Sequence, residues 1–301
     1  MINDIEKINT LQSSEDNFEV CEESAILDNE GNGNLVENRR IFRTPEGVLI
    51  YAGTDRGIGK AENHDRIIIN AQMSQFTVVD GMGGDRASQV LAQKIFENPE
   101  NLETAIELAQ SEMKKKNINK GACLISARLT PEKILKISQI GDCGATVFDG
   151  TGKIKFNANK QITTRFNHLE VKGMEKIGVE RAYQKLVEIS SKNFVSSSSA
   201  QMHTYNDFQL TEDDIVLLFS DAVLKNFSPE ELSYHIANNN DSKDIFDKLS
   251  DELRKKMQAA SSRFSSKADS IFSNPKERAK CYYDSDYVPQ SDNQSLVVFK
   301  V

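Results

Sequence analysis

The chain has 301 residues, of which 38% are hydrophobic and 27% are charged, as is ordinary for a globular protein with a sizeable core. Its formal net charge of -8 argues against a general nucleic-acid-binding surface, which would be basic. No apolar run is long enough to span a membrane, and the N-terminus lacks the basic and apolar regions of a signal peptide. We therefore expect a soluble, cytoplasmic protein. Export by a route that needs no such signal is the alternative.

The cysteines are few and widely spaced, without a CxxC pair, so they form neither a disulfide framework nor a zinc signature. The four are Cys21, Cys123, Cys143 and Cys281. No cysteine–histidine partnership is visible in the sequence. We interpret Cys123 and Cys143 as small buried residues rather than nucleophiles.

Residues 1–45 are acidic, poor in aromatic residues and too poor in apolar residues to fold alone. We expect a partly disordered N-terminal extension over this segment, followed by a single domain over residues 46–301. Within the extension, Phe18–Cys21 and Ile41–Arg43 are candidates for an edge hairpin.

Strands are predicted where short runs of β-branched and other apolar residues are bounded by Gly, Asn, Asp or Ser. The predicted strands cover residues 47–53, 66–70, 75–80, 121–129, 134–140, 145–148, 153–156, 215–219 and 295–301. The sequence Asp149-Gly150-Thr151-Gly152 predicts a hairpin turn between two of them.

Apolar residues at helical spacing predict three helices, whose apolar faces lie within residues 87–95, 102–113 and 245–257. Asn98 followed by Pro99 is typical of an N-cap with proline at the first helical position, and predicts that the second of these helices begins there. The helices fall between blocks of strands, which favours α+β layering over a parallel βαβ sheet.

A further helix is predicted to start at Ser228. Pro229 follows at the first helical position and Glu231 completes a capping box, while Phe227 and Leu232 are placed as a hydrophobic staple. Residues 160–206 show no clean period, and residues 261–290 are expected to be irregular.

Aspartates recur at the ends of the predicted strands. Asp80, Asp142 and Asp221 follow strands, whereas Asp65 and Asp292 precede them. One such aspartate is usually a turn former, but five beside Gly, Ser, Asn or His predict carboxylates that converge on one end of a sheet system.

Converged carboxylates need a cation, because like charges disfavour one another's ionised form. Oxygen ligands suit Mg²⁺ or Mn²⁺, whereas zinc would favour His or Cys, and His64 is the one histidine near this set. Two such metals lower the pKa of a bridging water and polarise a phosphoryl oxygen, which is the chemistry of phosphate-ester hydrolysis.

Over residues 47–301 the chain resembles the metal-dependent protein phosphatases of the 2C type, in their bacterial form. The motifs that carry the resemblance are Thr54–Gly57, Lys60, Asn63–Asp65, Val79–Gly84, Ile140–Cys143, Asp214 with Ser220–Ala222, and Asp292-Asn293. Each motif alone is weak, but their combination in this order is specific.

The resemblance implies an α+β fold, namely a four-layer αββα sandwich of two antiparallel sheets flanked by helix pairs. It also implies a phosphoserine/phosphothreonine protein phosphatase that uses two Mn²⁺ or Mg²⁺ ions and a third, weaker metal. The expected partner is a phosphorylated protein substrate, with no nucleic acid and no membrane, and the protein is expected to be a monomer.

The resemblance assigns roles to individual residues. Asp80 would bridge the two metals, the Gly81 carbonyl would bind the second, and Asp221 with Asp292 would complete the first. Asp142 would serve the third metal, Asp65 and His64 are further candidate metal-site residues, and Lys60 would bind the substrate phosphate.

Three residues depart from the family pattern: His64 replaces Glu or Gln, Lys60 replaces Arg, and Ala222 replaces Gly. They favour an alternative, a catalytically weak or inactive phosphatase-like binding module. A third reading is a phosphatase whose N-terminal extension and an insertion over residues 255–290 recruit a specific partner. Residues 160–206 match the family poorly.

Overall fold

The computed structural model describes residues 20–21, 24–28, 35–58, 61–82, 84–158, 194–239, 241–273 and 293–301, with side chains in the last helix described as far as Ala259. Two candidate site residues, Lys60 and Asp292, lie outside the described residues, as do most of residues 160–206.

Within the described residues, two seven-stranded sheets form the centre of the fold. The first sheet has the order β1 (Val20–Cys21), β3 (Arg40–Arg43), β4 (Leu49–Asp55), β14 (Gln294–Lys300), β13 (Ile215–Phe219), β9 (Gly144–Phe148) and β10 (Ile154–Asn157). The second has the order β11 (His203–Thr204), β8 (Ile134–Ile140), β7 (Gly121–Leu129), β6 (Gln75–Met82), β5 (Arg66–Asn70) and β2 (Ala25–Leu27), with β12 (Phe208–Gln209) also paired to β8. A short 3-10 helix, η1 (Ala71–Met73), joins β5 to β6.

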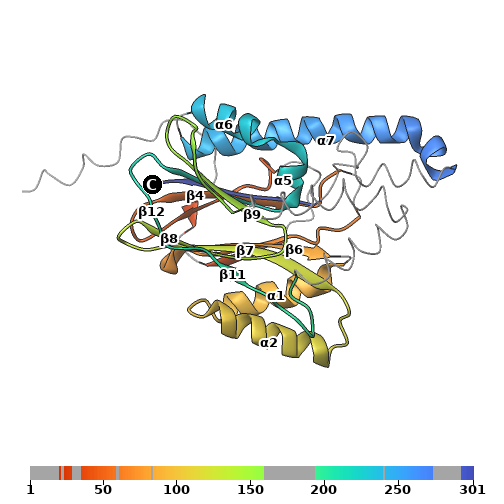
Figure 1. Ribbon diagram of the computed structural model, residues 1–301, viewed down its shortest axis with the longest axis horizontal. Helices are drawn as coiled ribbons and strands as arrows, with labels where there is room; N and C mark the ends of the chain where they lie inside the picture. The colour runs from red at the N-terminus through yellow and green to blue at the C-terminus, as the bar shows by residue number, and fades with distance from the viewer. Residues whose placement is uncertain are drawn as a thin grey trace, which may run out of the picture.

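Helices cover the outer face of each sheet (Figure 1). Helices α1 (Asp85–Glu97) and α2 (Leu102–Lys115) pack beneath the second sheet, and α5 (Asp221–Asn226), α6 (Pro229–Ala237) and α7 (Ser242–Ser273) lie over the first. This arrangement confirms the expected four-layer α+β sandwich.

The sequence builds these layers because strands with two apolar faces are buried on both sides. In β13, Val216 and Leu218 pack into the core between the sheets, whereas Leu217 and Phe219 pack against the helices above. Successive side chains of a strand point to opposite faces, so this continuous apolar run joins two hydrophobic cores.

The capping box of α6 is confirmed. The Glu231 backbone N–H donates to Ser228 Oγ (3.2 Å), and the Ser228 N–H donates to Glu231 Oε2 (2.8 Å). The start predicted for the second helix is wrong: α2 is capped by Asn101, whose Oδ1 accepts from the Thr104 N–H (3.0 Å). Asn98 instead closes α1, because its N–H donates to the Lys94 carbonyl.

Two other expectations need correction. The segments expected to form an edge hairpin do pair at the sheet edge, but β1 and β3 run parallel, as the one parallel pair among the described strands. Residues 261–273 are not irregular, because α7 continues to Ser273. The rest of the segment expected to be irregular lies outside the described residues.

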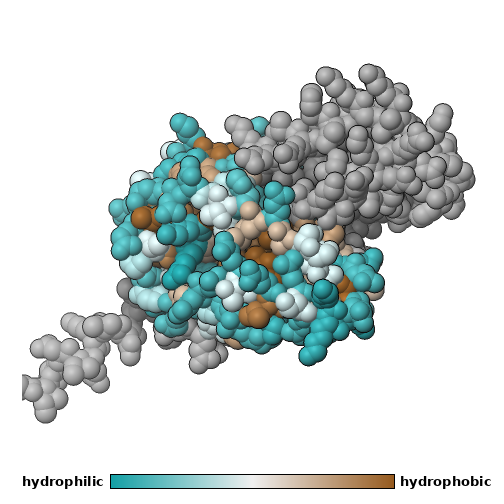
Figure 2. Space-filling model, turned by 60° about the horizontal axis from the view of Figure 1, so that its bottom comes forward, coloured by the Kyte–Doolittle hydropathy of each residue, from teal (hydrophilic) through white to brown (hydrophobic). Residues whose placement is uncertain are grey.

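The surface carries few large hydrophobic side chains. Among the described residues only Val20, Leu108 and Tyr234 are exposed large hydrophobic residues. Figure 2 shows a face that is largely hydrophilic, with hydrophobic residues in small groups. None of the helices in the described part of the chain has the length and apolar character needed to cross a membrane.

Candidate metal centre

Three of the predicted carboxylates lie together at one end of the sandwich. Asp80, Asp142 and Asp221 each offer an oxygen that lies within 4.8 Å of the other two, and all three residues are partly exposed. We call this group the carboxylate cluster. Each member comes from a different part of the fold, so the cluster exists only when the two sheets are stacked.

Asp80 comes from the second sheet, on β6. The strand does not end at Asp80 as predicted but continues to Met82, with Asp80 opposite Cys123 of β7. Phe76 and Val78 of β6 belong to the core between the sheets. Because alternate residues of a strand share a face, Asp80 continues this inward-facing row to the end of the sandwich.

Asp142 lies in the short turn where the chain crosses from β8 in the second sheet to β9 in the first. Gly141 begins the turn with a φ of 88°, a left-handed conformation that glycine adopts without a steric penalty. The Gln139 side-chain amide donates to the Cys143 carbonyl (2.7 Å) and spans the turn from within the core.

Asp221 is the first residue of α5, directly after β13 of the first sheet. The preceding residue, Ser220, is fully buried and bonded to β14 through Ser295. Ser295 Oγ in turn donates to Thr54 Oγ1 of β4 (2.8 Å), and the Asn63 side chain donates to the same oxygen (3.0 Å). A buried polar network thus fixes the backbone that carries Asp221.

The loop before β5 is held by Asn293, at the start of the last strand. The Asn293 side-chain amide donates to the carbonyls of Arg56 (2.9 Å) and Glu62 (2.8 Å), and its Oδ1 accepts from the His64 N–H (3.2 Å). These three bonds position the loop against the end of the first sheet.

Asp65 and His64 lie near the cluster but outside its group of three oxygens. Asp65 is fully buried, and its charge contributes with those of Asp80 and Asp142 to the environment of Cys143. The His64 imidazole instead has its Nε2 3.6 Å from Oε2 of Glu62. The structure therefore turns the His64 side chain toward Glu62.

Gly81 is held in a tight backbone cradle. A Cβ at this position would lie 2.7 Å from the His64 carbonyl oxygen, 2.8 Å from Ser88 Oγ and 3.0 Å from the Gly84 carbonyl oxygen. Any larger residue would have to move the backbone beside Asp80.

The neighbouring thiols are unsuited to nucleophilic chemistry. Burial raises the pKa of Cys123 and of Cys143 well above the ordinary value of 9.0, and the charges of Asp80 and Asp142 raise it further. A thiol acts as a nucleophile only as the thiolate, so both cysteines are inert at neutral pH.

Lys225 is a site residue that sequence reasoning missed. Its Nζ lies 2.5 Å from Oδ2 of Asp221, four residues earlier on α5. The signal that would have found it is the four-residue spacing, which places two side chains on one face of a helix. The helix has six residues, too few for apolar periodicity to reveal it.

The residues of the cluster fit a hard divalent cation. All three side chains offer oxygen, the donor type that Mg²⁺ and Mn²⁺ prefer.

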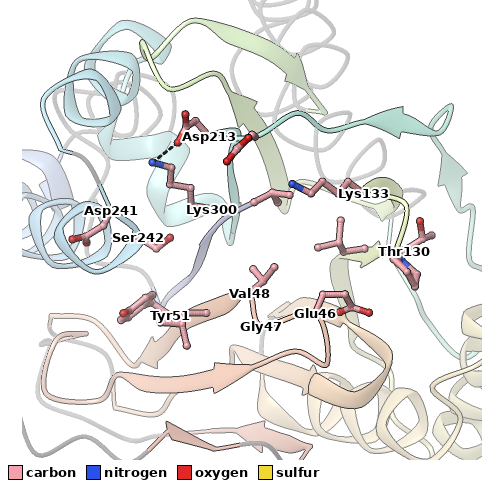
Figure 3. Close-up of a pocket in the computed structure, with 15 residues that line it drawn as sticks. Glu46, Gly47, Val48, Tyr51, Thr130, Lys133, Asp213, Asp241, Ser242 and Lys300 are labelled. Atoms are coloured by element: carbon pink, nitrogen blue, oxygen red, sulfur yellow. Dashed lines mark ion pairs between the residues drawn. The ribbon is translucent and has the colours of Figure 1, made fainter. Parts of the chain in front are cut away.

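A pocket at the opposite end of the sandwich encloses about 490 Å³ (Figure 3). It lies by the first residues of β4 and β13 and the last of β14, whereas the carboxylate cluster is at the other ends of β13 and β6. Lys300 in this pocket pairs with Asp213 (2.8 Å), and Asp241 caps α7 by accepting from the Asp244 N–H (2.8 Å). These two pocket acids therefore have structural partners, and the pocket is separate from the cluster.

Comparison with known proteins supports the fold. No family model matches the sequence, and no curated protein matches it. Among solved structures, PppA, described as a key regulatory component of T6SS in Pseudomonas aeruginosa, is 14% identical with a TM-score of 0.58, covering 83% of this chain and 96% of its own.

Two further structures were determined with metals. The catalytic domain of the serine/threonine protein phosphatase PstP, in complex with two manganese ions, is 16% identical with a TM-score of 0.57, covering 84% of this chain and 97% of that one. RsbX in complex with magnesium is 12% identical with a TM-score of 0.54, and the match covers 87% of this chain and 98% of the RsbX chain. The chain therefore has the fold of the PPM serine/threonine phosphatases, the 2C-type family that its sequence motifs resemble.

Proposed function

We propose that the protein is a Mg²⁺- or Mn²⁺-dependent phosphoserine/phosphothreonine phosphatase acting on a phosphorylated protein. The observation that carries the proposal is the convergence of Asp80, Asp142 and Asp221 within 4.8 Å at one end of the sandwich. The metals in the PstP and RsbX structures, which share this fold, support the choice of cation.

In this proposal the three carboxylates hold the metals together with the Gly81 carbonyl and Asp292, while Asp65 and His64 border them. When bound, the metals supply a water of lowered pKa and polarise a phosphoryl oxygen. The chain's own contribution is rigidity: the Ser220–Ser295–Thr54 network fixes the start of α5, and the cradle around Gly81 fixes the end of β6 after Asp80.

Substrate binding is assigned to Lys60, whose ammonium would contact the phosphate. An ammonium is a compact point charge and lacks the bidentate geometry of a guanidinium. We therefore expect Lys60→Ala to raise KM more than it lowers kcat.

The alternative, a phosphatase-like module that binds without catalysis, is favoured by one observation. Lys225 contacts Asp221, so one carboxylate of the cluster already has a cationic partner. A module of this kind would bind phosphoprotein without turnover at any metal concentration.

The test is hydrolysis of an aryl phosphate and of phosphoserine and phosphothreonine peptides by the purified chain, with Mn²⁺, with Mg²⁺ and with chelator. We expect metal-dependent turnover that Asp80→Asn and Asp221→Asn each reduce by orders of magnitude. Asp213→Asn is the matched control, because Asp213 is an exposed aspartate at the other end of β13. Absence of turnover with either metal on every substrate would contradict the enzyme and favour the module.

A further inference from the structure

An ammonium group already contacts the carboxylate cluster. Lys225 Nζ lies 2.5 Å from Oδ2 of Asp221, and the side chains are 35% and 17% exposed. Asp221 is also one of the three residues whose oxygens lie within 4.8 Å of one another. A positive charge supplied by the chain itself therefore contacts one of the carboxylates that would hold a metal.

The backbone beneath Lys225 is fixed. Ala222 and Val223 of α5 are buried, and the Asn226 side-chain amide donates to the Ala222 carbonyl (2.8 Å). Lys256 of α7 donates to the Asn226 carbonyl (2.9 Å) and so ties the end of α5 to the long helix. Because α5 is anchored, departure of the Lys225 ammonium from Asp221 would require rotation of its own side chain, which is 35% exposed.

Ammonium and divalent metal compete for the same carboxylate. Before a metal can bind Asp221 Oδ2, the ion pair between Lys225 and Asp221 must break, or the metal and the ammonium must share this oxygen. The free energy of the ion pair is then subtracted from that of metal binding, and the apparent Kd for the metal rises accordingly.

We propose that Lys225 is an internal competitor of the divalent metal at Asp221, so that metal binding displaces its ammonium. The protein then loads metal at higher concentrations than its carboxylates alone would require. This inference rests on the proposed function, because it concerns the regulation of the same metal site.

The experiment is calorimetric titration of Mn²⁺ into the metal-stripped full chain. Lys225→Met removes the ammonium and keeps an unbranched stem, and should lower the Kd for Mn²⁺ by about 3- to 30-fold, as expected for a partly exposed ion pair. Lys225→Arg keeps the charge and lets a guanidinium bind the carboxylate, so it should not lower the Kd below that of the wild type.

Lys120→Met is the matched control for charge alone. Lys120 is exposed and precedes Gly121, which pairs with Met82 at the same end of the second sheet. Losing this ammonium should shift the Kd by less than about twofold, since an exposed charge without contact to the cluster is screened by salt. Circular dichroism checks that each variant is folded. Lys225→Gln is a second variant without the ammonium, in case Lys225→Met does not fold.

The outcomes separate the two claims. If the wild type binds Mn²⁺ and Lys225→Met and Lys225→Gln bind no more tightly, the competitor role is wrong while the metal site stands. An equal gain in Lys120→Met would also overturn the competitor role, because bulk charge would explain it. If neither the wild type nor the Lys225 variants bind Mn²⁺, the metal site and the inference both fall.

Discussion

Ser220 and Ser295 are joined by two hydrogen bonds: the Ser220 N–H donates to the Ser295 carbonyl (3.2 Å), and the Ser295 N–H donates to Ser220 Oγ (3.0 Å). The first bond belongs to the backbone of neighbouring strands, but the second needs the serine hydroxyl. Both residues are fully buried, and Asp221 follows directly. The side chain of Ser220 therefore fixes the position from which Asp221 enters the cluster.

We expect Ser220→Ala to lower the free energy of unfolding by about 1–3 kcal/mol, because it leaves the buried Ser295 N–H without this acceptor. Chemical denaturation in urea measures the change. Ser111→Ala is the control, since it removes an exposed hydroxyl from α2. If Ser220→Ala and Ser111→Ala unfold at the same urea concentration, the network does not stabilise this end of the sandwich.

Asp142→Asn should have opposite effects with and without metal. In chelator, removing one of three close carboxylates relieves like-charge repulsion, so the melting temperature should stay the same or rise. In Mn²⁺, the wild type gains stability from the bound ion, about 2.7 kcal/mol at 100 times the Kd, and the variant should lose part of that gain.

Thermal melts of both proteins in the two buffers measure this reversal. Asp149→Asn is the control, since Asp149 caps a surface turn away from the cluster. A drop in the melting temperature of Asp142→Asn of equal size in chelator and in Mn²⁺ would indicate a structural role for Asp142 instead.

Gly81→Ala should destabilise the protein and weaken metal binding together. The added Cβ would lie 2.7 Å from the His64 carbonyl oxygen, so the backbone beside Asp80 must shift. Such overpacking typically costs about 1–3 kcal/mol. Gly150→Ala is the control, because the atom nearest its added Cβ would be Asp213 Cβ at 3.3 Å, which belongs to an exposed side chain that can shift by a few tenths of an ångström. Urea unfolding and Mn²⁺ titration report the two effects, and normal values for both would contradict the cradle.

The raised pKa values of the two cysteines beside the cluster lead us to expect that the protein loses stability at high pH. The folded state raises the pKa of Cys123 and Cys143 through burial, so it holds their protons to higher pH than the unfolded chain does. Below the pKa that the thiols have in the unfolded chain, the stability linked to these two protonated thiols is fully present. As the pH rises above the ordinary value of 9.0 toward the raised pKa values, it is progressively lost.

Urea unfolding at about pH 8 and about pH 10 measures this effect. The double variant Cys123→Ala/Cys143→Ala should lose less stability over that interval than the wild type. Thiol reagents should also leave both cysteines unmodified in the folded protein at neutral pH, and rapid labelling of either would contradict the inert assignment.

Much of the fold was readable from the sequence because its strands are strongly patterned. The apolar run at β13 and the capping box at Ser228 each specify their element locally. The start of α2 was not readable, because Asn98 and Asn101 are both suitable caps. The choice between them depends on how α1 ends, where the Asn98 N–H bonds the Lys94 carbonyl.

The length of α7 escaped prediction for a different reason. Beyond Met257 the sequence becomes rich in serine and lysine, so apolar periodicity no longer marks the helix. Extending an existing helix fixes one residue for each bond gained, which is far less costly than starting one. The helix thus continues to Ser273 through a polar sequence.

For the site, the sequence identified aspartates that the structure brings together, namely Asp80, Asp142 and Asp221. Their proximity depends on the stacking of two sheets, which no local sequence pattern encodes. The prediction that they form one site came instead from the order of motifs along the chain. Lys225 was missed because it contacts Asp221 only when α5 forms. This helix has six residues, too few for apolar periodicity to predict it. The roles of Lys60 and Asp292 stay predictions.

The central claim is that the carboxylate cluster binds divalent metal, and calorimetric titration of Mn²⁺ into the metal-stripped wild type and Asp80→Asn tests it most directly. We predict saturable binding to the wild type and loss of at least one binding event in Asp80→Asn, with both proteins folded by circular dichroism. Identical binding curves for the two proteins, or no binding to the wild type, would contradict the claim.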